Sequence, residues 1–168
     1  MIDRAYCVLM ARYNAWQNRQ LFELLKPLHL AELTRDRGAF FGSILGTLNH
    51  LLWGDLLWMV RLDGGERPAG GIGDSTTLHP TLGAWDAARF RADGRIMAWA
   101  DRLNAVDLTG DLSWYSGALG RHVTKPIAQC IVHMFNHQTH HRGQVHAMMT
   151  AAGLKGAVSD LVFMSEDA

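Results

Sequence analysis

Four long stretches of the sequence space their hydrophobic residues as amphipathic helices do, and strand patterns are nearly absent elsewhere. Residues typical of helix boundaries flank them: capping serine and threonine, proline in a first turn, glycine after a last turn. The expected helices run from about Asp3 to Leu25, over ILGTLNHLLWGDLLWMVRL with Ser43 as its cap, from Thr81 to about Ala105, and from Pro126 to Ala152 before Gly153. This pattern predicts an all-α fold, a four-helix bundle, which places its sites between facing helices.

The segments that join the helices differ in character. Between Asp63 and Pro80 the chain is rich in glycine and has no hydrophobic period, which predicts a long loop between the second and third helices. The stretch DLTGDLSWYSGALGRHVTKP is too rich in Gly, Ser and Thr for a helix. It predicts a short irregular segment or hairpin before the fourth helix, around Gly117 to Gly120. Three hydrophobic residues of the tail are expected to pack back on the bundle: Leu161, Val162 and Phe163.

Size and charge exclude several classes of protein. A chain of 168 residues suffices for one core, so residues 1–168 are expected to form a single domain. Lys plus Arg equals Asp plus Glu, at 16 each, so no net field attracts nucleic acid. Charged residues interrupt the N-terminal segment, and no later segment approaches the ~20 uncharged residues of a membrane span. We therefore expect a cytoplasmic protein without nucleic-acid or membrane partners, in which Cys7 and Cys130 are reduced core thiols.

The run FNHQTHHRGQVH holds four of the nine histidines, and helical phase separates them. At about 100° per residue, His141 falls inside the hydrophobic stripe of the fourth helix and His137 lies on its edge. The two are spaced i, i+4, so both imidazoles can reach a single metal ion at about 2.0 to 2.1 Å. The alternative is a pair of core histidines satisfied by hydrogen bonds. Gln138 replaces the general-base Glu of the HExxH helix, which argues against a peptidase of that type.

His50 is the candidate for a third ligand. It is the only histidine of the second helix, where hydrophobic surroundings require a partner for a polar ring. Gly46 and Gly54 lie one turn before and after it. Because glycine costs about 1 kcal/mol inside a helix, they indicate that space beside the ring is needed, with close helix packing as the alternative. Together His50, His137 and His141 predict a three-His site with a fourth position open to water or substrate.

Other residues are candidates for the surroundings of this site. His133 lies one turn before His137 and is expected on a polar rim, with a replacement ligand as the alternative. Five side chains are candidates for shaping a substrate mouth: Trp53, Asp55, Trp58, Arg61 and Arg142. Each also has a structural reading, because Trp is more often a core residue and Arg more often a solvated or ion-paired surface group.

Three motifs, in their order and spacing, resemble the DinB-like proteins of the DinB/YfiT superfamily: YNAWQNRQLF from Tyr13, NHLLWGD from Asn49 and FNHQTHHRGQ from Phe135. The resemblance spans nearly the whole chain. It implies a metal-binding four-helix bundle with ligands at His50, His137 and His141, the trio that helical phase also selects. It implies a homodimer, and it offers thiol-dependent chemistry as one activity, because superfamily members include transferases and isomerases that use bacillithiol or mycothiol. Many DinB-like members have no assigned reaction.

Three readings of the function remain open. The first is a metal-dependent enzyme of the thiol-transferase or hydrolase type, in which zinc or nickel activates a low-molecular-weight thiol or water toward a small-molecule substrate. The second is a non-catalytic structural or sensing module, in which the ion holds the second helix to the fourth. The sequence offers no clear fourth ligand, which favours the open, reactive site. A metal-free bundle is the third reading. Metal binding is expected to weaken below about pH 6, where imidazole becomes protonated.

The outer side of the fourth helix is the expected homodimer face, because its residues are small enough for close helix approach. These residues are Val132, Thr139, Gly143, Ala147 and Ala151.

Overall fold

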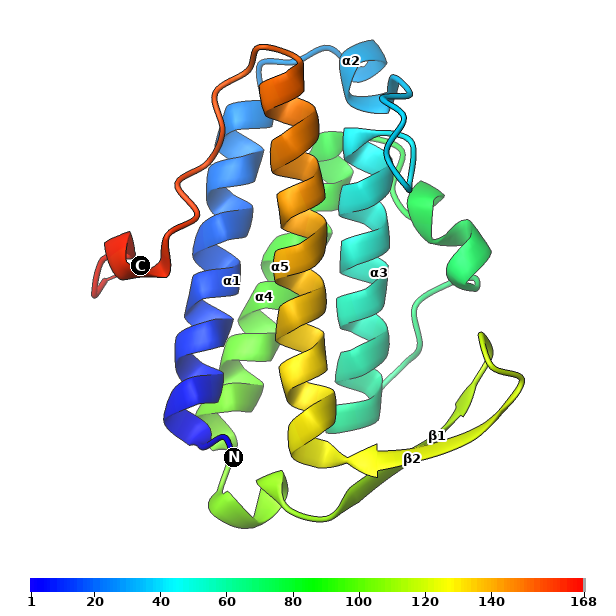
Figure 1. The fold of residues 1–168 in the computed structure, drawn as a ribbon, viewed down its shortest axis with the longest axis vertical. Coiled ribbons are helices and arrows are strands. Elements are labelled where there is room, and N and C mark those ends of the chain that lie inside the picture. The colour runs from blue at the N-terminus through cyan, green and yellow to red at the C-terminus, as the bar shows by residue number, and fades with distance from the viewer. Residues whose placement is uncertain (168) are drawn as a thin grey trace.

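The computed structural model describes residues 1–167 and is mainly helical, as the hydrophobic spacing predicts (Figure 1). Four long helices make up most of the chain: α1 (Arg4–Leu25), α3 (Ile44–Asp63), α4 (Leu82–Arg102) and α5 (Ile127–Ala151). Both α1 and α3 pack against α4 and against α5. α3 and α5 are antiparallel neighbours, so the two helices that carry the predicted ligands face each other. None of the helices within residues 1–167 has both the length and the hydropathy that crossing a membrane requires.

Side-chain caps set the start of three long helices. Asp3, Ser43 and Thr81 each accept a hydrogen bond from the backbone amide three residues further along, at 2.8, 3.0 and 3.2 Å respectively. The caps at Ser43 and Thr81 are those predicted. α4 ends at Arg102, earlier than the predicted end near Ala105, and the 3-10 helix η2 (Ala105–Leu108) follows it.

The connections contain more regular structure than the sequence indicates. A short helix, α2 (Leu30–Thr34), lies in the joint after α1, and a 3-10 helix, η1 (Ile72–Thr77), lies in the segment predicted as a plain loop. η1 packs against α3. Asn49 of α3 donates hydrogen bonds to the carbonyl oxygens of Thr76 at 3.1 Å and His79 at 2.9 Å. The loop prediction is wrong for residues 72–77 because these tertiary bonds, rather than local hydrophobic spacing, order the segment.

A hairpin precedes α5, which confirms the hairpin reading of that segment. Its strands β1 (Asp111–Ser116) and β2 (Arg121–Pro126) are antiparallel, and the register places Trp114 opposite Val123. The amide of Ile127 donates to the carbonyl of Gly110 at 3.0 Å, which ties the base of the hairpin to the start of α5. The hairpin extends from the lower end of α5 past α3 (Figure 1).

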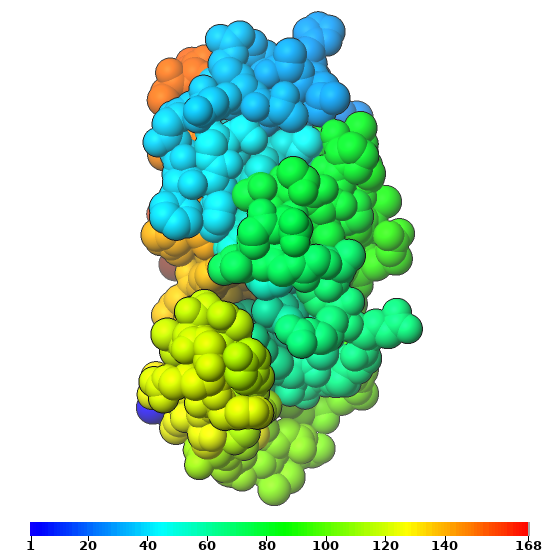
Figure 2. All heavy atoms as spheres, turned by 90° about the vertical axis from the view of Figure 1, so that its right-hand side faces the viewer, coloured from blue at the N-terminus to red at the C-terminus, as the bar shows by residue number. Residues whose placement is uncertain are grey.

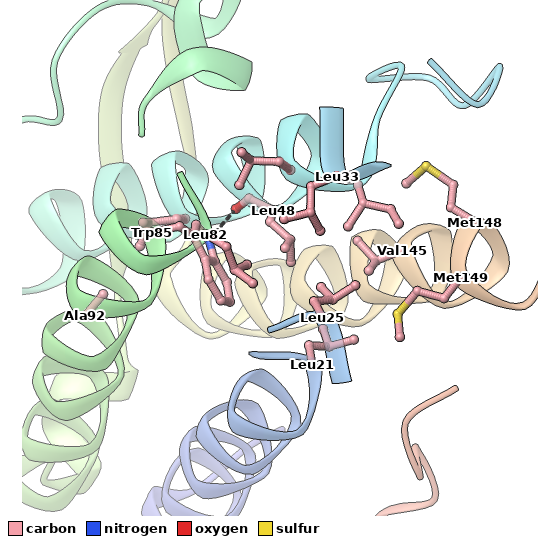
Figure 3. Packing of buried hydrophobic residues seen from close by; sticks show 13 residues of the cluster. Leu21, Leu25, Leu33, Leu48, Leu82, Trp85, Ala92, Val145, Met148 and Met149 are labelled. Atoms are coloured by element: carbon pink, nitrogen blue, oxygen red, sulfur yellow. Dashed lines mark hydrogen bonds between the residues drawn. The ribbon is translucent and has the colours of Figure 1, made fainter. Parts of the chain in front are cut away.

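Two hydrophobic clusters fill the space between the long helices. In the first, Trp85 of α4 packs among leucines of α1 and α3 and donates its indole N–H to the Leu48 carbonyl at 3.0 Å (Figure 3). The second lies around Met134 and Phe135 of α5 and includes the fully buried Cys7. Cys7 and Cys130 are both buried and unpaired, as predicted.

The C-terminal segment docks on α1 through its backbone rather than through its hydrophobic side chains. The Tyr13 hydroxyl donates to the Ser159 carbonyl at 2.6 Å, and Gln17 donates to the Val158 carbonyl at 2.6 Å. Val162 and Phe163 are 84% and 70% exposed. The prediction that these two side chains pack on the helices is therefore wrong. Hydrogen bonds from polar residues of α1 hold the segment in place.

Candidate metal centre

His50 of α3 and His137 and His141 of α5 converge on one point between the two helices. Each offers one ring nitrogen, and these three atoms lie within 4.8 Å of one another. His50 and His141 are buried and His137 is half-buried. Within residues 1–167, no Cys, Asp, Glu or further His side chain joins the group. The structure thus brings together the three histidines that the sequence singles out.

The His50 ring is oriented by Ser75 of η1. Nδ1 of His50 lies 2.9 Å from the Ser75 hydroxyl oxygen, which in turn donates its proton to the Ile72 carbonyl at 2.7 Å. Because the hydroxyl proton is already used, Ser75 accepts the Nδ1–H of His50, and the lone pair of the ring resides on Nε2. Ser75 is fully buried. No local pattern predicts this role, because Ser75 lies in a glycine-rich segment without hydrophobic periodicity.

Gln144 orients His141 in the same way. Its amide oxygen lies 2.7 Å from Nδ1 of His141, and its amide nitrogen lies 3.3 Å from Nε2 of His140. The amide oxygen can only accept, so His141 carries its proton on Nδ1 and its lone pair on Nε2. A carbonyl or hydroxyl acceptor behind each imidazole is the usual support of a metal-binding histidine.

His137 completes the group from the other side. Its Nε2 lies 3.0 Å from Nε2 of His141, close to the roughly 3.4 Å that separates two nitrogens bound at about 2.0 to 2.1 Å to a tetrahedral ion. Since His141 presents a lone pair there, His137 donates through its Nε2–H. Its buried Nδ1 has no hydrogen-bond partner among the described residues. The shared proton between the two Nε2 atoms therefore lies where a cation would bind.

An aromatic ring, Phe41, and a glycine, Gly54, shape the space around the three imidazoles. Phe41, just before α3, stacks on His50 with ring centroids 3.8 Å apart and lies 5.3 Å from the His141 ring. Gly54 leaves room for His137, because a Cβ at this position would lie 2.9 Å from His137 Cε1. Gly46 does not border the centre: its missing Cβ would meet the Phe41 carbonyl oxygen at 2.8 Å. The prediction that glycine leaves space beside the histidines is confirmed at Gly54. At Gly46 the alternative holds, because the missing side chain allows the backbone at Phe41 to pack closely against α3.

The centre favours uncharged imidazoles. Burial, together with the neighbouring His141 ring, lowers the pKa of His50 to about 4 and that of His137 to about 3. Burial also lowers the pKa of His141. Neutral imidazole is the form that binds a metal, so burial favours the binding charge state at neutral pH. His137 must in addition move its proton from Nε2 to Nδ1 before its Nε2 lone pair can bind an ion.

His133 and Trp58 lie along the edge of the centre nearer the hairpin. The His133 ring is exposed and lies 5.8 Å from the His137 ring and 5.1 Å from the Trp58 ring. His133 is outside the group of converging nitrogens. His133 therefore lies on the polar rim of the centre, as expected, and does not serve as a replacement metal ligand in this arrangement. Trp53, another candidate for the substrate mouth, is buried in α3.

Asp55 and Arg142 do not line a substrate mouth, contrary to the sequence-based expectation. Asp55 is fully buried, 2.6 Å from the Arg89 guanidinium, and accepts a hydrogen bond from Gln138 at 3.1 Å. Arg142 is buried and donates to Asn14. These residues belong to a polar network between the helices, which also contains the Arg89–Asp93 ion pair. A buried charge needs such partners, whereas the sequence alone does not show which side of α3 carries them.

The centre lies on the side of the molecule where the hairpin and the segment before α3 are found. Figure 2 shows both on one face, the hairpin in yellow and residues 35–43 in light blue, with part of α5 visible in a notch between them.

Comparison with known proteins identifies the family. The model of the DinB family matches residues 1–168. The chain belongs to the DinB family. It is also similar to Protein DinB of Bacillus subtilis (strain 168), with 24% identity over 157 residues, which cover 88% of this chain and 87% of that relative. The family membership that the three motifs predict is therefore confirmed, and the three-His group is compatible with a metal site in this family member.

Proposed function

We propose that this DinB-family chain binds one divalent metal ion through His50, His137 and His141, and that the ion serves a metal-dependent enzyme of the thiol-transferase or hydrolase type. The observation that carries the proposal is the convergence of three ring nitrogens within 4.8 Å, from two helices, without a fourth protein ligand among the described residues. Catalytic metal sites keep a position open in this way, whereas structural sites fill all four with protein side chains.

The donor set fits zinc or nickel, because neutral imidazoles suit both ions. A divalent ion held there would supply Lewis acidity, lowering the pKa of a thiol or water at the open position so that a nucleophile forms near neutral pH. The protein's own part is to hold the rings. Ser75 and Gln144 fix the Nδ1 protons of His50 and His141, and the Phe41 ring covers His50 and keeps water from that side.

The proposal includes the wider organisation of the chain. We take α1, α3, α4 and α5 as the four-helix bundle expected from the sequence, in a single cytoplasmic domain with α2, η1 and the hairpin as additions. The outer side of α5 is the proposed homodimer face, and four of its residues are exposed: Thr139, Gly143, Ala147 and Ala151. Sedimentation equilibrium should give the mass of two chains. A monomeric mass at micromolar concentration would reject the dimer.

The metal proposal is tested by elemental analysis of protein purified without an affinity tag. The wild type should hold about one equivalent of divalent metal per chain, and the His50→Ala and His137→Ala variants should lose it. His29→Ala is the matched control, because this exposed histidine lies outside the centre. Full occupancy in both ligand variants would reject the three-His site.

The catalytic proposal needs a separate measurement. A screen of small thiols against electrophiles and of hydrolysable esters compares the metal-loaded protein with His141→Ala. Turnover that depends on His141 supports the enzyme. Equal rates in both proteins would leave the non-catalytic metal module as the function.

A further inference from the structure

A cluster of three aromatic rings and one cation adjoins the proposed centre. Trp58 of α3 contacts Trp114 of the hairpin, with ring centroids 5.5 Å apart, and contacts His133 of α5 at 5.1 Å. The Arg61 guanidinium lies 4.5 Å from the Trp58 ring and 5.0 Å from the Trp114 ring. From three separate elements, these side chains build one continuous surface that we call the Trp58 wall: Trp58, Arg61, Trp114 and His133.

The charge of Arg61 has no acidic partner in the described part of the chain. No ion pair or hydrogen bond of its guanidinium occurs within residues 1–167, although the side chain is half-buried. Asp63, two positions later, is occupied by Arg95 at 3.4 Å and Arg102 at 2.9 Å. Burial and the nearby Arg67 charge lower the pKa of Arg61, so the surroundings disfavour its cation rather than neutralise it. A half-buried arginine without a counter-ion is well suited to receive an anion.

The orientation of Arg61 leaves its donors available. The Trp58 and Trp114 rings are inclined at 71° to each other, so the planar guanidinium can lie flat on only one of them. Its N–H donors point outward in its own plane and make no hydrogen bond within residues 1–167. A cavity of about 460 Å³ adjoins Arg61. Its lining is mixed, with hydrophobic side chains such as Trp99, Val106 and Ile131 beside the charged side chains of Asp63, Arg102 and Asp107. The guanidinium is therefore not sealed between the two indoles, and a planar carboxylate can approach it edge-on.

The wall also lies within reach of the three histidines. His133, one turn before His137, lies 5.8 Å from it, and Trp58 is the next ring in the same direction. Side chains on a helix lean toward its N-terminus, so Trp58 and Arg61 lean along α3 toward His50. From the His137 ring the contacts run to His133, then to Trp58 and then to the Arg61 guanidinium, over successive separations of 5.8, 5.1 and 4.5 Å.

Holding the hairpin in place is the other role open to Arg61. The hairpin, however, is already tied to α5 by the hydrogen bond from the Ile127 amide to the Gly110 carbonyl, and Trp114 contacts Trp58 directly. An apolar side chain would fill the same space without placing a charge next to two indoles. The positive charge thus remains to be explained.

We infer that the Trp58 wall recognises the substrate of the centre and that this substrate is an elongated organic acid. Arg61 binds its carboxylate, the Trp58 and Trp114 rings contact its planar or hydrophobic middle, and its reacting end faces the three histidines. The inference rests on the proposed function, because it takes the open position of the three-His site as the place of reaction.

The test uses full-length protein loaded with Co²⁺ and two matched probes, mercaptohexanoate and mercaptohexanol. The thiolate of either probe that binds the metal produces a sulfur-to-cobalt charge-transfer band, and the probes differ only in the terminal carboxylate. The wild type should bind the acid about tenfold more tightly than the alcohol, the size of one charge-assisted hydrogen-bonded contact. Arg61→Gln should abolish this preference, and Arg61→Lys should retain part of it.

The control variant is Arg91→Gln, which removes the same charge from an exposed position of α4 and should keep the full preference. If Arg61→Gln, folded by circular dichroism and loaded with Co²⁺, still prefers the acid, the inference is wrong. It is equally wrong if the wild type binds both probes with the same affinity. Should neither probe give the band with the wild type, the open metal position itself would be rejected, and the proposed function would fail before the wall is tested.

Discussion

Gly54 of α3 lies against the His137 ring of α5, at a distance that admits no side chain: a Cβ on Gly54 would be 2.9 Å from His137 Cε1. The atom in its way is the outer edge of an imidazole, not backbone. A side chain at position 54 would therefore move the ring and leave the helices in place. The geometry of the three-His group thus depends on a residue that has no donor atom of its own.

Gly54→Ala should weaken metal binding without unfolding the protein. The added methyl displaces the His137 ring, and alanine is otherwise favoured over glycine in a helix by about 1 kcal/mol. The matched control is Gly94→Ala in α4, where a Cβ meets nothing within 4 Å. The control should be slightly more stable and bind metal normally. Competition with a chromophoric chelator measures the affinities, and an unchanged affinity in Gly54→Ala would contradict the close contact.

Ser75→Ala should reduce metal affinity by about 10- to 100-fold, the usual effect of removing a hydrogen-bond partner behind a ligand histidine. The hydroxyl is the acceptor that fixes the Nδ1 proton of His50. Thr77→Ala is the control in the same 3-10 helix. Its exposed hydroxyl also donates to a backbone carbonyl three residues earlier, at 3.0 Å, but touches no histidine. Equal losses in the two variants would indicate that η1 matters only as a folded segment.

The ligand trio could be predicted from the sequence because helical phase is a local property. His137 and His141 share a face by their spacing alone, and His50 is the only histidine of α3. Ser75 could not be predicted in this way. Its contact with His50 arises because Asn49 holds η1 against α3, and no spacing along the chain records that contact. The ligand histidines lie on regular helices and can be read from local spacing. Ser75, which orients one of them, is brought into place by contacts between segments that are distant in the sequence.

Asp55 shows the same limit in another form. Its position in NHLLWGD, near His50, suggested a role at the site, yet its side chain pairs with Arg89 of α4. In a helix that is hydrophobic nearly all round, the hydrophobic stripe does not indicate which face looks toward which neighbour. Only the packing of α3 between α4 and α5 decides that His50 faces the centre and Asp55 faces the ion pairs.

Asp55→Asn should destabilise the fold by about 3 to 5 kcal/mol, because it leaves the buried Arg89 with one carboxylate instead of two. Asp63→Asn is the control. It removes a carboxylate that pairs with Arg95 and Arg102 near the surface, and should cost about 1 kcal/mol or less. Urea unfolding followed by circular dichroism gives both values. A cost for Asp55→Asn as small as that of the control would show that the buried network adds little to stability.

Metal binding should persist to a lower pH than an ordinary histidine site allows. Burial holds the pKa of His50 at about 4 and that of His137 at about 3, below the usual 6.5. A lowered pKa means that the folded protein keeps these rings neutral as the pH falls, so protons compete with the metal at His50 and His137 only once the pH nears those values. Burial lowers the pKa of His141 as well, so competition at the third ring also begins below the usual 6.5. Metal binding is therefore expected to be lost at a lower pH than the value of about 6 that is expected from the sequence for ordinary histidine ligands. Affinity measured by calorimetry, over the range in which circular dichroism shows a folded protein, should stay nearly constant from pH 8 to about 5 and then fall. A midpoint near 6.5 would mean that the rings are open to solvent, and the buried three-His arrangement would be wrong.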